Sequence, residues 1–516
     1  LYVKTVAGGT FKDGNSTYKV LSNGDPMTVA ITATTATGAY TIPSTVTNPG
    51  GQTYTVTEIA DEAFKGNTGL TSVVIPDGVT TIGESAFEGC TNMTSVTIPD
   101  TVDTIGASAF KGCSKLDGVT IPDGVTTIAA STFEGCTKLA TVTLPATGLT
   151  TIGDNAFAGC TMLTAAPIPA TADTIGAGAF NGCTGLTSVT VPNEVDTIGA
   201  GAFENCTGMT NIILSTNLTA IADRTFAGCN KLPAVTIPKN VETIGESAFE
   251  GCTSLESMTI PNEVETIGKK AFSGCTKLEE VSFGTGVKTI GEEAFAGCSG
   301  LTVLTIPSNV TEIEDGAFKN ATNLTTVYFE GNAPTGGTDM FAGCSTSLVL
   351  YCKAGSTGWD KTPWPSLNVV EVAAPVIVGP DDQVVVLGET ATFSVEVTSG
   401  ETPTYQWYKG TEAISGATGS SYTISSVEYS DADDYSVEVS NYVGTATSKT
   451  AALVVQTAVN GTFEDGDSTY KVLSNGETPT VSITATTATG AYTVPTTVTN
   501  PGGQTYTVTE IADEAF

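Results

Sequence analysis

Residues 249–272 read F-E-G-C-T-S-L-E-S-M-T-I-P-N-E-V-E-T-I-G-K-K-A-F, and this stretch decides the fold because the chain repeats its pattern at a fixed spacing. The Phe that ends each stretch recurs every 23 residues, except for one interval of 24 between Phe133 and Phe157. The series is Phe64, Phe87, Phe110, Phe133, Phe157, Phe180, Phe203, Phe226, Phe249, Phe272, Phe295, Phe318 and Phe341. Such a period predicts a solenoid, in which each turn packs on its neighbours.

The shared pattern is A-F-x-G-C-T-x-L-T-S-V-T-I-P-x-x-V-x-T-I-G-x-x. In L-T-S-V-T-I-P the Leu, Val and Ile alternate with Ser and Thr, which predicts a strand with its apolar residues inward. Stacked turns would place these strands in one parallel ladder, and Pro167, which has no N–H to donate, would interrupt it near the 24-residue turn. We expect V-x-T-I-G to be a second short strand and E-S-A-F-E-G-C to be a single helical turn that aims Phe and Cys inward.

Composition limits the function. The chain has 54 acidic and 20 basic residues, a net charge of −34, which disfavours nucleic-acid binding. It has no histidine, which removes Ser-His-Asp and Cys-His catalysis and most zinc sites. A glycosidase would need a carboxylate pair, and no pair stands out from the regular columns. No apolar run is long enough to span a membrane. We therefore expect a monomeric, non-enzymatic protein without a cofactor and without membrane insertion in this stretch.

The sequence predicts five regions of a mainly β protein. We expect a β-rich cap at residues 1–59, the repeat array at 60–345, a C-terminal cap and joint at 346–374, and an immunoglobulin-like sandwich at 375–456. Residues 457–516 repeat the first cap at an offset of 452 residues, so that Phe516 matches Phe64. This second copy leads us to expect another array beyond Phe516.

The sandwich is predicted from its short strand patterns and from four positions. Trp407 stands where such domains bury a Trp, and Tyr435 stands at the position of the tyrosine corner. Val395 and Val437 occupy the two positions that usually hold the disulfide between the sheets. We expect packing to replace that disulfide.

The cysteines follow the repeat, three residues after each Phe: Cys90, Cys113, Cys136, Cys160, Cys183, Cys206, Cys229, Cys252, Cys275, Cys298 and Cys344. Asn67 and Ala321 replace Cys in two turns, which a metal site would not tolerate, so we interpret the series as a buried column of thiols. Cys352 lies outside the series, and a Cys344–Cys352 disulfide is an open alternative.

Three surfaces are candidates for binding. The first is the outward face of the main strands, where Ser188, Asn211, Ser257, Glu280, Thr305 and Tyr328 are the candidate ligand residues. Tyr328 is the only aromatic residue in these columns, and interface hot spots are rich in Trp, Tyr and Arg. The alternative is that the Ser and Thr serve strand formation alone.

The other two candidates have competing structural interpretations. Carboxylates recur at Asp77, Asp100, Asp123, Asp103, Asp173, Asp196, Glu242 and Glu265, and again at Asp431, Asp433 and Asp434. They could collect calcium, but Lys239 and Lys288 stand in the same columns, which favours a solvated acidic face. Trp359 and Trp364 suit either a carbohydrate-binding surface or a cap over the last turn.

The repeat resembles the BspA-like leucine-rich repeat of bacterial surface proteins, on the pattern A-F-x-G-C-x-x-L-x-x-V-x-I-P-x-x-V-x-x-I-G-x-x-A-F. The sandwich resembles bacterial I-set immunoglobulin-like domains. The first resemblance implies a right-handed solenoid and an extracellular protein, at the bacterial surface or secreted, that binds a protein or glycan by adhesion. An architectural stalk that presents other domains is the competing function.

Overall fold

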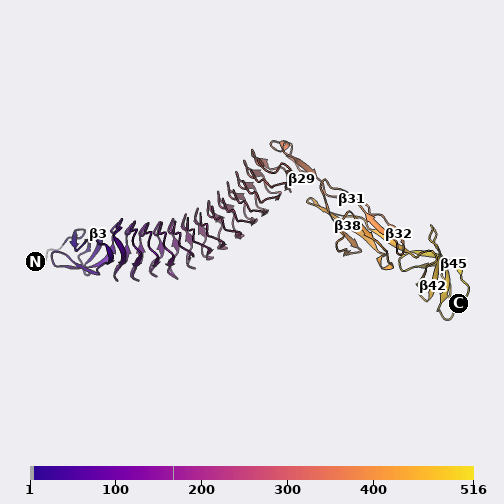
Figure 1. Ribbon diagram of the computed structural model, residues 1–516, viewed down its shortest axis with the longest axis horizontal. Coiled ribbons are helices and arrows are strands. Elements are labelled where there is room, and N and C mark those ends of the chain that lie inside the picture. The colour runs from indigo at the N-terminus through magenta and orange to yellow at the C-terminus, as the bar shows by residue number, and fades with distance from the viewer. Residues whose placement is uncertain (1–4, 167) are drawn as a thin grey trace. The chain divides into compact units, whose positions relative to one another are not determined.

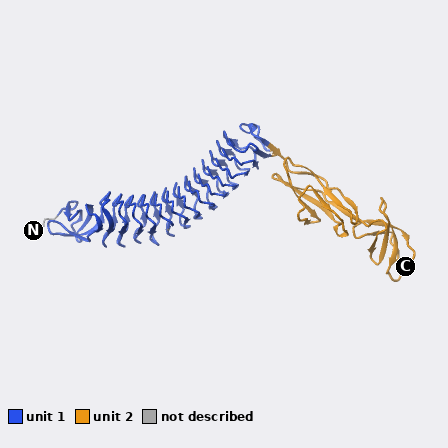
Figure 2. Cartoon of the chain, viewed as in Figure 1, with its two compact units in different colours: residues 1–352, 356–369 blue, residues 353–355, 370–516 orange. Residues whose placement is uncertain are grey.

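The structure is a computed structural model that describes residues 5–166 and 168–516. The chain divides into two compact units, Leu1–Cys352 with Ser356–Val369, and Lys353–Gly355 with Val370–Phe516 (Figure 2). In the described residues every regular element is a β-strand, except for two short 3-10 helices, η1 (Trp364–Ser366) and η2 (Tyr429–Asp431). The prediction of a mainly β chain is confirmed.

The first β-module, residues 5–64, joins the start of the solenoid. Its strands are β1 (Thr10–Asp13), β2 (Ser16–Ser22), β3 (Thr28–Thr34), β4 (Gly38–Thr41), β5 (Thr45–Thr47) and β6 (Thr53–Ile59). Strand β6 pairs in parallel with the first repeat through Ile59 and Ile82, and β4 pairs with it through Tyr40 and Val73. The module therefore continues both strand ladders of the solenoid.

Most solenoid turns contribute two short strands, and successive turns stack one on the next (Figure 1). The front ladder consists of β7 (Leu70–Val74), β9 (Ser95–Thr97), β11 (Gly118–Thr120), β13 (Thr141–Thr143), β16 (Ser188–Thr190), β18 (Asn211–Ile213), β21 (Ser257–Thr259), β23 (Glu280–Ser282), β25 (Val303–Ile306), β27 (Thr326–Phe329) and β29 (Val349–Lys353). The back ladder consists of β8 (Thr81–Ile82), β10 (Thr104–Ile105), β12 (Thr127–Ile128), β14 (Thr151–Ile152), β15 (Thr174–Ile175), β17 (Thr197–Ile198), β19 (Ala220–Ile221), β20 (Thr243–Ile244), β22 (Thr266–Ile267), β24 (Thr289–Ile290), β26 (Glu312–Ile313) and β28 (Thr335–Gly336).

The front ladder is not the single ladder that the sequence predicted. Its strands form separate sheets, β4 to β13, β16 with β18, β21 with β23, and a sheet that begins with β25 and β27. The expected break near the 24-residue turn is present, because only an isolated bridge between Ala165 and Ser188 lies there among the described residues. Pro167 itself lies outside the described residues. A second break follows β18, where Pro233 takes the place of Thr210 and has no N–H to donate.

The turn that carries Phe and Cys is not helical, so that prediction was wrong. The residue two positions before each Phe has a positive φ, for example Ser85 at 53° and Lys270 at 55°. This left-handed residue lets alternate N–H groups point toward the next turn: Ser85 donates to the Ala107 carbonyl at 2.9 Å, and Phe87 donates to the Ala109 carbonyl at 2.7 Å. Alternate hydrogen bonds therefore run between turns, and the others close tight turns, as Glu88 N–H does to the Ser85 carbonyl at 3.0 Å, so no α-helix forms.

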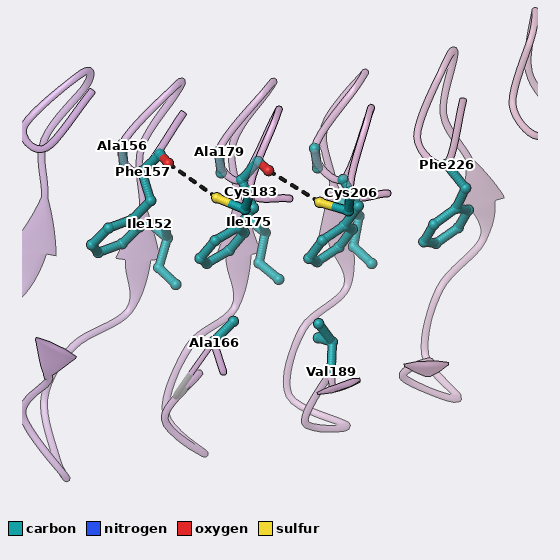
Figure 3. Packing of buried hydrophobic residues seen from close by; sticks show 14 of the residues in the cluster. Ile152, Ala156, Phe157, Ala166, Ile175, Ala179, Cys183, Val189, Cys206 and Phe226 are labelled. Carbon is teal, nitrogen blue, oxygen red and sulfur yellow. Dashed lines mark hydrogen bonds between the residues drawn. The ribbon is translucent and has the colours of Figure 1, made fainter. Parts of the chain in front are cut away.

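Phe and Cys form one continuous column, which we call the Phe–Cys spine. Every repeat Phe from Phe64 to Phe318 donates its N–H to the following turn at 2.7–3.0 Å. Neighbouring rings along the column stack with centroids 4.7–5.9 Å apart. Each repeat Cys donates its Sγ–H back to the Phe carbonyl of the preceding turn, as Cys183 does to Phe157 and Cys206 to Phe180, both at 3.2 Å (Figure 3). The sequence predicted the inward column but not this hydrogen bond.

The second unit contains a sandwich and the second β-module, residues 457–516. After β30 (Val369–Val372), the sandwich has β31 (Val376–Val378), β32 (Gln383–Val386), β33 (Ala391–Ser394), β34 (Glu396–Thr398), β35 (Thr404–Lys409), β36 (Glu412–Ala413), β37 (Ser421–Ile424), β38 (Asp434–Asn441), β39 (Gly444–Thr447) and β40 (Ala451–Gln456). The module has β41 (Thr462–Asp465), β42 (Ser468–Ser474), β43 (Thr480–Thr486), β44 (Thr497–Thr499) and β45 (Thr505–Ile511).

The sandwich core matches the sequence prediction. Trp407 is fully buried and donates its Nε1–H to the Gly419 carbonyl at 2.9 Å. The Tyr435 hydroxyl donates to the Asp431 carbonyl at 2.8 Å, which is the geometry of a tyrosine corner. Val395 and Val437 are both buried, so packing occupies the positions that a disulfide usually takes.

The thiol hydrogen bond is testable at Ala321, the position in the spine where Cys is replaced by Ala. We expect Ala321→Cys to raise the free energy of unfolding by about 1 kcal/mol, because the new Sγ–H would reach the Phe295 carbonyl as its neighbours reach theirs. We expect Cys298→Ala to lower it by about 1–2 kcal/mol, through the lost bond and the lost volume. Urea unfolding followed by circular dichroism measures both. A neutral or destabilising Ala321→Cys would show that the thiols only fill space.

The left-handed turn residue is testable at Ser131, whose φ is 56°. Gly178, Gly201 and Gly316 occupy the same position in other turns, so glycine fits there. We expect Ser131→Gly to raise the free energy of unfolding by about 1 kcal/mol, because glycine has no Cβ penalty in this region. Ser131→Val serves as the opposite control and should be destabilising. Equal unfolding midpoints for the two variants in urea would contradict the assigned conformation.

Candidate functional site

The thiols of the Phe–Cys spine are weakly reactive because they are buried. Burial raises the pKa of Cys90 to about 11 and the pKa of Cys136 and Cys183 to about 12. Since thiols react as thiolates, these side chains are poor nucleophiles and poor metal ligands at neutral pH. Cys344 and Cys352 are both thiols, so the structure does not contain the alternative Cys344–Cys352 disulfide. Cys344 instead donates to the Phe318 carbonyl at 3.2 Å, as the other spine cysteines do to theirs.

Some of the acidic side chains join neighbouring turns. Asp61 Oδ1 accepts the Glu84 N–H at 2.8 Å, and Asp223 Oδ1 accepts the Glu246 N–H at 2.7 Å. In the column considered for calcium, Glu265 forms an ion pair with Lys288. Across residues 5–166 and 168–516, the structure has no group of three or more Cys, Asp or Glu side chains that could hold a metal ion.

The acidic residues of the sandwich are also committed to local structure. Asp431 Oδ2 accepts the Glu428 N–H at 2.8 Å, and the Asp433 carboxylate accepts the N–H of Asp434 at 2.8 Å. These bonds shape the turn that precedes β38.

In the part of the chain that the structure describes, no helix has the length and apolar character of a membrane span.

The six candidate ligand residues lie on the outward face as three adjacent pairs. Ser188 is opposite Asn211, Ser257 is opposite Glu280, and Thr305 is opposite Tyr328, in each case on neighbouring parallel strands. Five of the six side chains are exposed, and Tyr328 is half-buried. Each pair belongs to a different sheet of the interrupted front ladder. The structure therefore gathers them into three separate patches on one face rather than into a single pocket.

The front ladder carries larger apolar groups that are not among the six candidate ligand residues. Tyr351 on β29 lies opposite Tyr328, with ring centroids 5.3 Å apart, so Tyr328 is not the only aromatic residue of its column. Ile213 is 56% exposed and Val303 is 49% exposed. Continuing the 23-residue count past Phe341 would have found Tyr351, which stands 23 residues after Tyr328.

The two tryptophans after the array do not form an open surface. Trp364 is buried and donates its Nε1–H to the Pro334 carbonyl at 3.0 Å. Trp359 is half-buried, packs edge-on against Trp364 at 5.0 Å, and donates to Ser356 Oγ at 2.8 Å. Both rings also contact Phe329 at the end of β27. These contacts favour packing over carbohydrate stacking.

Comparison with protein families finds two matches. The model of the BspA type leucine-rich repeat region matches residues 57–184, 150–261 and 243–354, which together cover more than half of the chain. An immunoglobulin-domain model matches residues 374–441. A search of the curated proteins finds no match.

Several solved structures are similar to this chain. A leucine-rich cell surface protein from Faecalibacterium prausnitzii has 31% sequence identity over 54% of this chain and 96% of its own, with a TM-score of 0.31. A leucine-rich repeat protein from Bacteroides capillosus has 30% identity over 26% of this chain and 97% of its own, with a TM-score of 0.22. The pneumococcal vaccine antigen PcpA has 21% identity over 68% of this chain and 95% of its own, with a TM-score of 0.44.

The assignment of the cysteines as buried structural thiols predicts their reactivity. We expect a disulfide reagent such as Ellman's reagent to react slowly with the folded chain. In guanidinium, which unfolds the chain, the reagent should react with all 12 cysteines. Cys344 should react first, because it is half-buried whereas the other cysteines are buried. The variant Cys344→Ala should remove this first phase. A fast reaction at Cys113 or Cys136 would contradict the assignment.

Proposed function

Because the chain belongs to the BspA-type leucine-rich repeat family, we propose that it is a non-enzymatic interaction module of a bacterial surface or secreted protein. It binds an extracellular protein or glycan through the outward face of the front ladder. The family membership supports an interaction role, and the cell-surface description of the relative from Faecalibacterium prausnitzii supports the location.

The observation that carries this proposal is the difference in burial between the two faces of the front strands. In β16, β21 and β23 the middle residue is buried and the two flanking residues are exposed. The inward residues are committed to packing with the Phe–Cys spine. The outward residues can change without affecting that packing, which suits a surface that adapts to a ligand.

The composition of this face indicates how it would bind. Its side chains are mostly small and hydroxylated. Its larger apolar groups are few: Ile213 lies on one sheet, and Val303 and the Tyr328–Tyr351 stack lie on another. A contact at one such group contributes little affinity alone, but linked weak contacts along one rigid face add up. Binding would therefore depend on several turns at once.

A stalk that presents other domains is the second candidate, and a specific observation favours it. Many exposed hydroxyls beside the front ladder are already bonded to the preceding turn, as Thr210 Oγ1 is to the Thr187 carbonyl at 3.2 Å. Hydroxyls used in this way strengthen the rod and offer less to a ligand. The two candidates differ in whether the chain itself binds.

The proposal is tested with the full chain on arrays of glycans and extracellular matrix proteins. For a ligand found there, we expect Ser257→Lys with Glu280→Lys to weaken binding about 3- to 10-fold, about 0.7–1.4 kcal/mol, and the further change Tyr328→Ala to weaken it more. The matched control is Thr243→Lys with Thr266→Lys, an outward pair on the back ladder, which should leave binding unchanged. Surface plasmon resonance measures the affinities, and thermal melting checks folding.

Two outcomes would contradict the interaction module. If the full chain binds nothing on either array, the stalk is the better description. If the front-ladder and back-ladder variants bind equally well, the chain binds, but not through the face proposed.

A further inference from the structure

The outward face of the front ladder has a hollow where two neighbouring strands stop pairing. Strands β7 and β9 pair at three positions, and so do β11 and β13. Between these two pairs of strands, β9 and β11 pair only through Ser95 and Gly118. The ladder is therefore open beyond this one pair, on the side of Thr97 and Thr120.

A backbone hydrogen bond is missing at the same place. In the preceding turn, Ile75 donates its N–H to the Thr97 carbonyl at 3.0 Å. Ile98 is the equivalent of Ile75, but over the residues that the structure describes its N–H makes no such bond to the Thr120 carbonyl. Ile98 and Thr120 both line the hollow, so a backbone donor on one wall and a backbone acceptor on the other are available to a ligand.

The opening exposes an apolar floor. Val96 and Ile98 are half-buried, whereas their equivalents in the preceding turn, Val73 and Ile75, are only 1% and 2% exposed. Val119, from the other wall, also lines the hollow. Side chains that the ladder buries in the preceding turn therefore reach the surface here.

Threonine hydroxyls surround this floor. The hollow has a volume of about 320 Å³, and four exposed threonines line it: Thr97, Thr120, Thr141 and Thr143. Beside the ladder, the Thr94 hydroxyl is already bonded to the Thr71 carbonyl at 3.1 Å. Within the described chain the four lining hydroxyls make no such bond, so they are able to bond a ligand.

Gly118 keeps the hollow open. Ser72, Ser95 and Ser188 occupy the equivalent position in other turns. A Cβ atom at Gly118 would lie 2.7 Å from Thr141 Oγ1, so a side chain there would displace this hydroxyl. The absence of a side chain at this one position therefore provides the space for both the hollow and the Thr141 hydroxyl.

The lining of the hollow indicates the chemistry of its ligand. All eight residues that line it in the described chain are uncharged, which suits a neutral ligand. Threonine hydroxyls both donate and accept hydrogen bonds, as the hydroxyls of a sugar do. Small-molecule pockets have volumes of about 300–1,000 Å³, and this hollow lies at the lower end of that range. It therefore suits one ring better than a segment of peptide chain.

We propose that this hollow is a subsite for one neutral sugar ring of a glycan. The C–H face of the ring lies on Val96 and Ile98, and the ring hydroxyls bond the surrounding threonines. One of them joins the Ile98 N–H to the Thr120 carbonyl, because a hydroxyl accepts and donates at the same atom. The inference rests on the proposed binding function and specifies a glycan as the ligand of the front face.

The test titrates the full chain, with isotope-labelled Ile and Val methyl groups, with glucose, galactose, mannose and N-acetylglucosamine. We expect at least one of these sugars to shift the methyl NMR signals of Val96 and Ile98 in a saturable way. The Kd should be about 1–10 mM, as expected for a small ligand with few contacts. The methyl signals of Val189, which is buried in another turn, should not move. No saturable shift with any of the four sugars would overturn the proposal.

Matched variants locate the binding. Gly118→Ser should weaken sugar binding at least about tenfold, because the new side chain occupies the hollow and displaces the Thr141 hydroxyl. Thr120→Val removes one hydroxyl at nearly constant size and should weaken binding about 3- to 10-fold. The control is Thr127→Val, an exposed position on the back strand of the same turn, which should leave binding unchanged. Equal sugar affinity of Gly118→Ser and the unaltered chain would contradict the assignment of the hollow.

The outcomes separate this proposal from the proposed function. A chain that binds on the arrays through Ser257 and Glu280, without a sugar-induced shift at Ile98, would overturn the sugar subsite alone. A chain that binds nothing on the arrays and none of the four sugars would overturn both. If a matrix protein shifts the Ile98 signals and no sugar does, the hollow holds a protein, and the ligand class proposed here is wrong.

Discussion

The structure depends on the hydrogen bond from each repeat Phe N–H to the next turn, made beside a stack of Phe rings. This bond is present at every repeat from Phe64 to Phe318, whereas the front and back ladders are both interrupted. Where Pro233 removes a donor from the front ladder, Phe226 still bonds to Ala248 at 2.8 Å and stacks on Phe249 at 5.3 Å. The spine therefore keeps the turns in register where the front strands do not, and the thiols add a second bond between turns, to the Phe carbonyls.

The sequence predicted which side chains point inward, because these follow from the repeat period. It did not predict the left-handed turn, which depends on the backbone conformation of single residues. Phe and Cys were placed inward because their spacing is constant, and Leu, Val and Ile because strands alternate. The left-handed turn left no such signal, since Ser85, Arg224, Lys270 and Glu293 all adopt it. None of these four is Asn, Asp or Gly, the residues that normally mark this backbone conformation. The hydrogen bonds between turns hold the four residues in it.

The candidate surface was predicted in position but not in organisation. Alternation along each strand was enough to identify Ser257 and Glu280 as outward neighbours. The break after β18 coincides with Pro233, where one missing N–H outweighs an otherwise regular pattern, whereas the break between β23 and β25 has no proline in the strand. Tyr351 was missed because it lies beyond residue 345, where the array was expected to end, although its strand continues the ladder.

The arrangement also explains how polar side chains link the turns. An acidic side chain on a turn gains a bond by accepting an N–H of the next turn, as Asp154 does from Ala177 at 2.7 Å. The thiols likewise gain a bond to the Phe carbonyl of the preceding turn, and burial raises their pKa, which lowers their reactivity. Outward positions of the front strands such as Ser257 and Glu280 are exposed, and recognition is able to change there without cost to the rod.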